Sequence, residues 1–185
     1  MFALGTPQLA AAVFTAVVAG YMALVAFGNI TDFGTNREFV RHVLAMDTTF
    51  RDEDVMWRAI ESRTVADIAY VAIIGWETLT AAVLLLATGY WVKGIRRDGG
   101  ARRRARRAST LGLVMVVLLF GLGFVVIGGE WFQMWQSSDW NGLEPAGRNV
   151  MIAAFGLVLV HLSGGRDRDS DRDRDRDDGA RQDAV

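Results

Sequence analysis

Four long apolar segments constrain the fold more than any other feature of this chain. They lie at about 9–30, 68–92, 111–130 and 145–162. A helix rises about 1.5 Å per residue, so a bilayer core of about 30 Å requires roughly 20 helical residues. The third segment reaches this length if 128–131 continue the helix, and the fourth does if the helix starts near Pro145. The sequence predicts an all-α, polytopic membrane protein with four transmembrane helices; three spans plus an interfacial helix are the alternative.

Charged residues are separated from these apolar segments. The chain is 51% hydrophobic and 22% charged, and most of the basic residues fall in an Arg-rich block at 93–107 or in a tail of alternating Arg and Asp. The run at 166–178 has no apolar residues to bury, so we expect 164–185 to be disordered and 1–163 to form the folded domain. A helix supported by ion pairs is the alternative for the tail.

The basic block predicts an orientation in the membrane. Cytoplasmic loops carry an excess of Lys and Arg, so the Arg-rich loop 93–107 and both termini are expected in the cytoplasm of a bacterium, with the protein in the plasma (inner) membrane. A topogenic role beside lipid headgroups explains the block, and no nucleic-acid partner is predicted. The loops at 31–67 and 131–148 are then expected on the outer face.

The first outer loop is expected to contain two amphipathic helices that cover the bundle or lie at the lipid interface. Thr35 and Glu38 fit a capping box that opens the first helix. The acidic run 52–54 is expected to start the second, which continues through 55–60. Thr64–Asp67 has the same pattern and is expected to cap the second transmembrane helix. With the Trp-rich second loop, these helices would form an outer cap.

Several classes of site are excluded or not predicted. The absence of cysteine excludes disulfides, thiolate metal sites and cysteine nucleophiles. With only His42 and His161, a three-histidine zinc site is excluded within one chain, and their expected placement on opposite faces argues against a bis-histidine haem. No sequence pattern resembles a nucleotide-binding loop or a serine triad. The cofactor therefore stays unknown, with no sign of haem, zinc or nucleotide, and no metal site is assigned.

Glu77 is the sharpest anomaly, because it lies near the middle of the second apolar segment. An ionised carboxylate at bilayer depth is costly, so this side chain should face the bundle interior. The first three apolar segments contain no Lys or Arg to pair with it. We expect a neutral carboxylic acid that is hydrogen-bonded to Thr, Tyr, Trp or a freed backbone carbonyl. A proton relay or ligand contact and a structural bond between helices are equally weighted alternatives.

A cluster of tryptophan and polar residues at 128–142 follows the third segment. The tryptophans are typical of a helix leaving the bilayer. Asn and Gln among them favour a packed, hydrogen-bonded loop over a binding pocket. Glu130 opens this cluster, and we expect it to pair with Arg37, Arg41 or Arg148, with a ligand or metal contact as the alternative.

The candidate functional residues form two groups, and no catalytic residue is assigned. Glu77 and Glu130 are the intramembrane candidates. The outer-face candidates for contact with a ligand or partner have polar or aromatic side chains: Asn29, Asp32, Asn36, His42, Asp47, Trp131, Trp135, Gln136, Asp139, Trp140 and Asn141.

Several motifs together carry a family resemblance. They are GNITDFGTNREFVRHVLAMDTTF at Gly28–Phe50, RAI at Arg58–Ile60, Tyr70, Glu77 and GGEWFQMWQSSDWNG at Gly128–Gly142. With them the chain resembles a bacterial family of predicted small integral membrane proteins, catalogued as domain of unknown function 2165, over roughly residues 8–162. The resemblance implies a multi-span bundle and brings no established activity, substrate or cofactor.

The favoured function is that of a non-enzymatic membrane subunit, stabiliser or sensor with a polar and aromatic outer face. Its expected partners are the lipid bilayer and either another protein or a second copy of the chain. A proton- or cation-linked transporter component that uses Glu77 and Glu130 is the first alternative. A membrane enzyme acting on a lipid or quinone is the second.

Overall fold

The computed structural model describes residues 6–94 and 99–182, with side chains for 6–94 and 99–164, and these residues contain no strand. The elements in chain order are α1 (Pro7–Thr31), α2 (Phe33–Ala45), the 3₁₀ turn η1 (Met56–Arg58), α3 (Arg63–Gly94), α4 (Gly99–Val117), the π-helix η2 (Leu118–Trp131), the 3₁₀ turn η3 (Met134–Gln136) and α5 (Leu143–Gln182).

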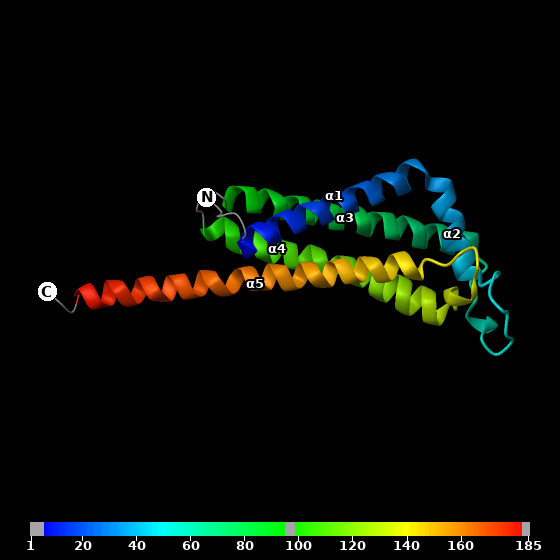
Figure 1. The fold of residues 1–185 in the computed structure, drawn as a ribbon. Helices are drawn as coiled ribbons and strands as arrows, with labels where there is room; N and C mark the ends of the chain where they lie inside the picture. The colour runs from blue at the N-terminus through cyan, green and yellow to red at the C-terminus, as the bar shows by residue number, and fades with distance from the viewer. Residues whose placement is uncertain (1–5, 95–98, 183–185) are drawn as a thin grey trace.

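Four helical stretches are long and apolar enough to cross a membrane. They are 7–31, 63–94, 99–131 and 143–164, where the third combines α4 and η2. Figure 1 shows them side by side along one axis, each running opposite to the one before it in the chain. The prediction of an all-α protein with four transmembrane helices is confirmed.

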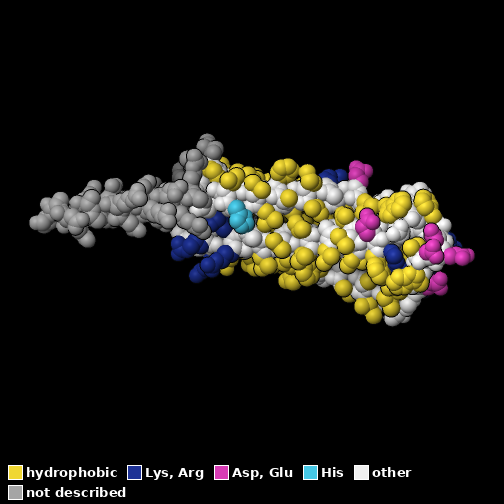
Figure 2. Space-filling view, turned by 90° about the horizontal axis from the view of Figure 1, so that it is seen from below, with side chains coloured by type: hydrophobic (Ala, Val, Ile, Leu, Met, Phe, Trp, Pro, Cys, Tyr) yellow, Lys and Arg dark blue, Asp and Glu magenta, His cyan; other side chains and the backbone are white. Residues whose placement is uncertain are grey.

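Small side chains line much of the buried face of α1, although large ones such as Trp91 and Tyr70 are buried elsewhere in the bundle. On α1 the buried stripe includes Ala11, Thr15, Ala19 and Ala26. Small residues at such spacings let helix backbones approach closely, which stabilises helix pairs in lipid. Outward-facing residues such as Leu24 are largely exposed, and Figure 2 shows hydrophobic side chains along the length of the bundle. This surface is suited to lipid tails.

The two ends of the bundle differ in structure and charge. At one end, residues 32–62 with α2 and η1 lie beside residues 132–142 with η3, and we call these two segments the cap (Figure 1). The other end carries the α3–α4 connection. Figure 2 shows a group of Lys and Arg side chains toward that end and Asp and Glu side chains toward the cap. The side of the membrane on which each end lies stays a prediction.

The predicted start of the first cap helix is wrong. α1 ends at Thr31 and α2 already begins at Phe33, because the chain turns at Asp32, whose backbone N–H still donates to α1 (Gly28 O, 2.8 Å). Thr35 is therefore inside the helix, and its hydroxyl donates to the Asp32 carboxylate at 3.0 Å. No capping box forms between Thr35 and Glu38.

The second predicted cap helix is only the turn η1. Asp52 begins the turn that leads into it: its backbone carbonyl accepts from the N–H groups of residues 55 and 56 at 3.0 and 3.1 Å. The backbone at Ala59 is extended and ends the turn. The N–H of Ile60 then bonds to the carbonyl of Leu44 at 2.8 Å. The segment is tied to α2 by this bond instead of continuing as a helix.

α3 begins earlier than predicted. It starts at Arg63, and the hydroxyl of Ser62 accepts from the backbone N–H of Val65 at 3.4 Å. The cap is thus Ser62, not Thr64, and the helix gains one residue before the predicted cap.

Most of the Arg-rich block is helical rather than a loop. α3 continues to Gly94, and α4 begins at Gly99 and carries the block through 102–107. Ala and Arg are both good helix formers, which explains why the third helix extends back into the block. Arg96 and Arg97 lie outside the described residues.

The third span includes 128–131, as its length required, but its second half is wound as a π-helix. At its end the N–H of Phe132 donates to the carbonyl of Ile127, five residues back, at 3.0 Å. A π-helix of this length is uncommon, and the sequence analysis did not predict it. Gly129 permits close packing here, because a Cβ on it would lie 2.8 Å from Leu143 Cδ2.

α5 starts at Leu143, whose N–H is capped by Asn141 Oδ1 at 3.1 Å, two residues before Pro145. It continues as helix to Gln182. The disorder expected for 164–185 stays a prediction. The domain boundary at residue 163 stays a prediction.

Candidate functional site

A chain of side-chain hydrogen bonds joins three helices around Glu77. Glu77 on α3 is 2% exposed, and its Oε2 accepts from Nδ2 of Asn29 on α1 at 2.7 Å. Asn29 Oδ1 in turn accepts from Nδ2 of Asn36 on α2 at 2.8 Å. The Asn29 amide therefore uses its donor toward the bundle interior and its acceptor toward the cap.

Tyr70 holds Asn29 from a second direction. This buried tyrosine on α3 donates its hydroxyl to the backbone carbonyl of Asn29 at 3.0 Å. The ring of Phe33, the first residue of α2, packs on Tyr70 with 4.8 Å between centroids. Both the side chain and the backbone of Asn29 are thus fixed to α3.

The partner of Glu77 differs from the expectation. Glu77 lies near the middle of α3, and Asn29 lies in the last turn of α1, which ends at Thr31. The turns of α3 before Tyr70 therefore extend past α1 beside α2. The partner is an asparagine amide, whereas Thr, Tyr, Trp or a backbone carbonyl was expected. Asn29 was predicted only as an outer-face residue at the end of the first segment.

Glu130 has none of the predicted ion pairs. It is exposed in the last turn of η2. Arg37 instead forms two bonds of 2.5 Å to Asp67, which raise the pKa of its guanidinium. Arg41 pairs with Glu38 at 2.8 Å. Among residues 6–94 and 99–164, no ion pair joins Glu130 to Arg148 either.

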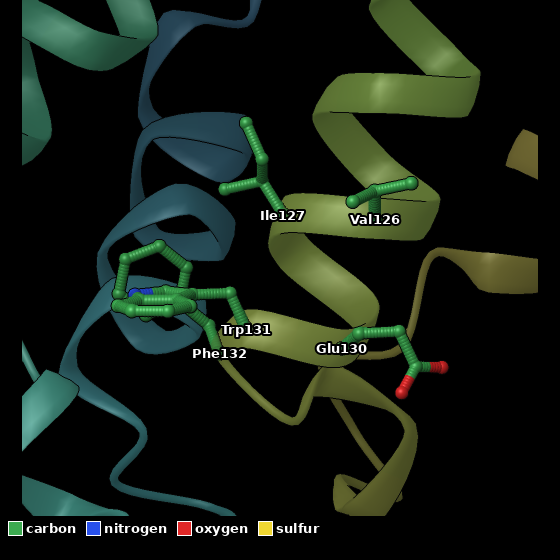
Figure 3. Close-up of a pocket in the computed structure, with 5 residues that line it drawn as sticks. All are labelled: Val126, Ile127, Glu130, Trp131 and Phe132. Carbon is green, nitrogen blue, oxygen red and sulfur yellow. The ribbon is translucent and has the colours of Figure 1, made fainter.

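A shallow, open groove of about 550 Å³ lies beside Glu130 and is almost entirely apolar. Figure 3 shows the Glu130 carboxylate pointing away from the rings of Trp131 and Phe132. Val126 and Ile127 complete the lining. A groove without convergent polar groups lacks the features of a typical ligand site.

A second cluster lies in the cap around His42. Its Nδ1 is 2.8 Å from the Asp47 carboxylate, and because a carboxylate only accepts, the ring nitrogen is the donor. The ring of Trp140 stacks on His42 at 4.6 Å and 14°. Phe39 contacts the edge of Trp140 at 6.1 Å. The cluster joins α2 to the Trp-rich second loop.

Polar residues of the second loop bind the first loop. Gln136 Oε1 accepts from the backbone N–H of Phe50 at 2.9 Å, and the hydroxyls of Thr48 and Ser137 are 2.8 Å apart. Ser137 also accepts from the N–H of Trp140 at 2.9 Å. This agrees with a packed, hydrogen-bonded loop, and the two loops together form the predicted cap.

The remaining candidates are not brought together. Asp32 and Asp139 are exposed, and Asn141 caps α5. Trp131 and Trp135 are about half exposed. In the described part of the chain, no three His, Asp or Glu side chains are grouped as metal ligands would be.

The sequence analysis missed a buried polar contact in the opposite half of the bundle. Ser109 on α4 accepts from Nε1 of Trp91 on α3 at 3.0 Å, and its hydroxyl is 3.1 Å from that of Thr15 on α1. Hydroxyl residues in the apolar stripes of α1 and α4 were the available signal, since such groups bond between membrane helices.

One known protein family matches this chain. The model of predicted small integral membrane proteins, DUF2165, matches residues 7–163. The chain belongs to the DUF2165 family. The match covers four potential spans, the cap, the Glu77 chain and the His42 cluster, so this DUF2165 protein is an integral, multi-pass membrane protein of unknown function. No curated protein and no solved structure matches it.

Proposed function

We propose that this protein is a non-enzymatic membrane subunit or sensor whose cap contacts a partner. The observation that carries the proposal is the hydrogen-bonded chain from Glu77 through Asn29 to Asn36. It ties the cap helix α2 to the interior of the bundle. A change in the bundle that breaks this chain would release α2, and a partner on the cap would sense it.

The polar groups of the cap support a structural rather than a catalytic role. His42 is held by Asp47 and by the ring of Trp140, and Arg37 is held by Asp67. General acid–base catalysis requires its groups within hydrogen-bond reach of one reacting centre. The residues noted above are instead engaged with one another.

Transport through Glu77 and Glu130 is not favoured by the geometry. Glu77 is buried against α1, whereas Glu130 is exposed in the last turn of η2. A proton path requires closely spaced relay groups, and within the described part of the chain no hydrogen bond links these two carboxyls. Glu77 is better explained as the anchor of the cap.

Photo-crosslinking in cells tests the proposal. A crosslinking amino acid replaces Ser138 or Asp139, both exposed in the cap, and the matched control replaces Leu24, which faces outward from the bundle. We expect one reproducible partner from the cap positions, absent from Leu24, and weaker crosslinking when Asn29→Ala is added.

Two outcomes would overturn the proposal. One is a cap that crosslinks no reproducible partner, in a protein that is also purified without a ligand. The other is a lipid or quinone retained on the purified protein, detected by mass spectrometry and absorption, that the protein converts chemically. The second result would favour a membrane enzyme.

A further inference from the structure

Four exposed aromatic rings and one arginine form a surface patch on the cap. Trp57 and Trp131 meet edge to face at 5.7 Å, and Phe50 and Trp135 do so at 5.9 Å. Phe50 is 73% exposed, Trp57 69%, Trp135 48% and Trp131 46%. We call these residues, with Arg58, the aromatic patch. Such a concentration of exposed rings marks a contact surface.

Arg58 lies between two of these rings. Its guanidinium carbon is 4.9 Å from the centroid of Trp131 and 5.5 Å from that of Trp57. Nη1 reaches the backbone carbonyl of Trp131 only at 3.5 Å. Nε is buried and has no hydrogen-bond partner. The rings therefore hold the guanidinium in place. The buried Nε is out of reach of a ligand, so the terminal nitrogens, engaged only by the long contact to Trp131, are the donors available to an oxyanion.

The aromatic patch continues the outer surface of the bundle. Residues 108–129, between Arg107 and Glu130, contain no charged residue. An α-helix of this length spans about 33 Å at about 1.5 Å per residue; the π-helical winding of 118–129 shortens it toward the bilayer core of about 30 Å. Val126 and Ile127, exposed just before Trp131, extend this apolar wall up to the patch. Trp131 is thus at the level of the lipid headgroups.

The first cap loop meets the end of this wall. In Figure 1 the cyan loop that contains η1 lies beyond the end of η2, at the cap end of the bundle. Trp57 on this loop contacts Trp131 at the end of η2. The loop is therefore held where lipid that surrounds the bundle would meet it.

We propose that the aromatic patch is a bilayer-interface anchor in which Arg58 binds the phosphate of a phospholipid headgroup. Indole rings favour the headgroup region because they are apolar with one polar edge. The acidic run 52–54 in the same loop opposes a general attraction of anionic lipid. Recognition therefore depends on the phosphate itself, and a zwitterionic phospholipid suffices.

Spin labels test the anchor, and the absence of native cysteine allows each label to be placed alone. Phe50→Cys reports the patch, Ser138→Cys is the exposed cap control, and Leu24→Cys is the lipid-facing control. In phosphatidylcholine nanodiscs, we expect the label at 50 to report the headgroup region: its collision rate with a water-soluble nickel chelate should lie below that at 138 and above that at 24, with the reverse order for oxygen. A label at 50 that behaves like the one at 138 overturns the anchor.

Lipid retention tests the role of Arg58. After transfer from phosphatidylcholine into maltoside detergent, native mass spectrometry measures the phospholipid that stays bound. We expect Arg58→Gln to reduce retention several-fold, Arg58→Lys to reduce it less, and Arg63→Gln, at an exposed arginine without a ring contact, to leave it unchanged. Equal retention in Arg58→Gln and Arg63→Gln overturns the phosphate site. If Arg58→Gln does not fold, the label at 50 still decides the anchor.

Discussion

The Asn29 amide donates a hydrogen bond of 2.7 Å to the Glu77 carboxyl, across 48 positions of sequence. Asn36 donates to the same Asn29 side chain from the cap. One amide therefore links α3, the second potential span, to the cap helix α2. The same contact provides a buried carboxyl with a donor in a part of the bundle that has no Lys or Arg.

Loss of the Asn29 side chain should destabilise the bundle. Asn29→Ala leaves Glu77 without its donor, and an unsatisfied buried polar group costs about 1–3 kcal/mol. Glu77→Gln keeps an acceptor for Asn29, so we expect a smaller loss. Unfolding of each variant in mixed detergent micelles measures both effects. A double-mutant cycle with Glu77→Ala should show coupling, and strictly additive effects would contradict the contact.

Removal of Asn36 should loosen the cap without unfolding the bundle. In Asn36→Ala the link from α2 to Asn29 is lost, while Glu77 keeps its partner. We expect faster amide hydrogen exchange in α2 and unchanged exchange in the middle of α3. Thr35→Ala is the matched control, because the exposed Thr35 bonds only locally to Asp32. Equal exchange in both variants would show that Asn36 does not hold the cap.

Gly112 should be intolerant of a side chain. A Cβ at this position would lie 2.5 Å from Leu84 Cδ2 and 2.6 Å from Leu84 Cγ, in the buried α3–α4 contact. Overpacking of a core typically costs about 1–3 kcal/mol, so Gly112→Ala should lower the midpoint of thermal unfolding in detergent. Gly75→Ala and Gly89→Ala have open space around the new methyl group and should be neutral or stabilising. A similar midpoint for all three would refute close packing at Gly112.

Cysteine labelling should report the orientation of the protein. We expect Ser138→Cys in the cap to react with a membrane-impermeant maleimide added to intact cells whose outer membrane is permeable to the reagent. Arg103→Cys at the other end should react only after the inner membrane is opened. This expectation follows from the basic residues at the start of α4. The reverse labelling pattern would show that the protein has the opposite orientation.

Helix ends show where local sequence rules succeed and where they fail. Thr35 and Glu38 have the residue spacing of a capping box, yet α2 begins before them. It does so because Asp32 alone forms the turn between α1 and α2. The acidic run before 55–60 did start a helical turn, but the backbone bond from Ile60 to Leu44 stopped it after η1. Capping patterns report local preference, and contacts with another helix override it.

The candidate site shows the same division. Glu77 was identified because a carboxyl group in an apolar segment is costly, and this reasoning requires no partner. Asn29 and Asn36 appeared in the sequence only as members of a polar set. The chain of bonds from Asn36 through Asn29 to Glu77 depends on how far α3 extends beside α1. The number and length of the apolar segments did not predict this. The contact of the Arg58 guanidinium with the rings of Trp57 and Trp131 likewise joins the first cap loop to the end of η2.

By itself, the sequence determined the four apolar helices, the separation of charge from apolar surface and the family, because length and hydrophobicity act through each segment alone. The tertiary structure decided the register of α3 against α1, the π-winding of η2, the joining of two loops into the cap and the partner of Glu77. These features arise from side chains distant in the chain that meet only when the helices pack, and their directional bonds are specified by that packing.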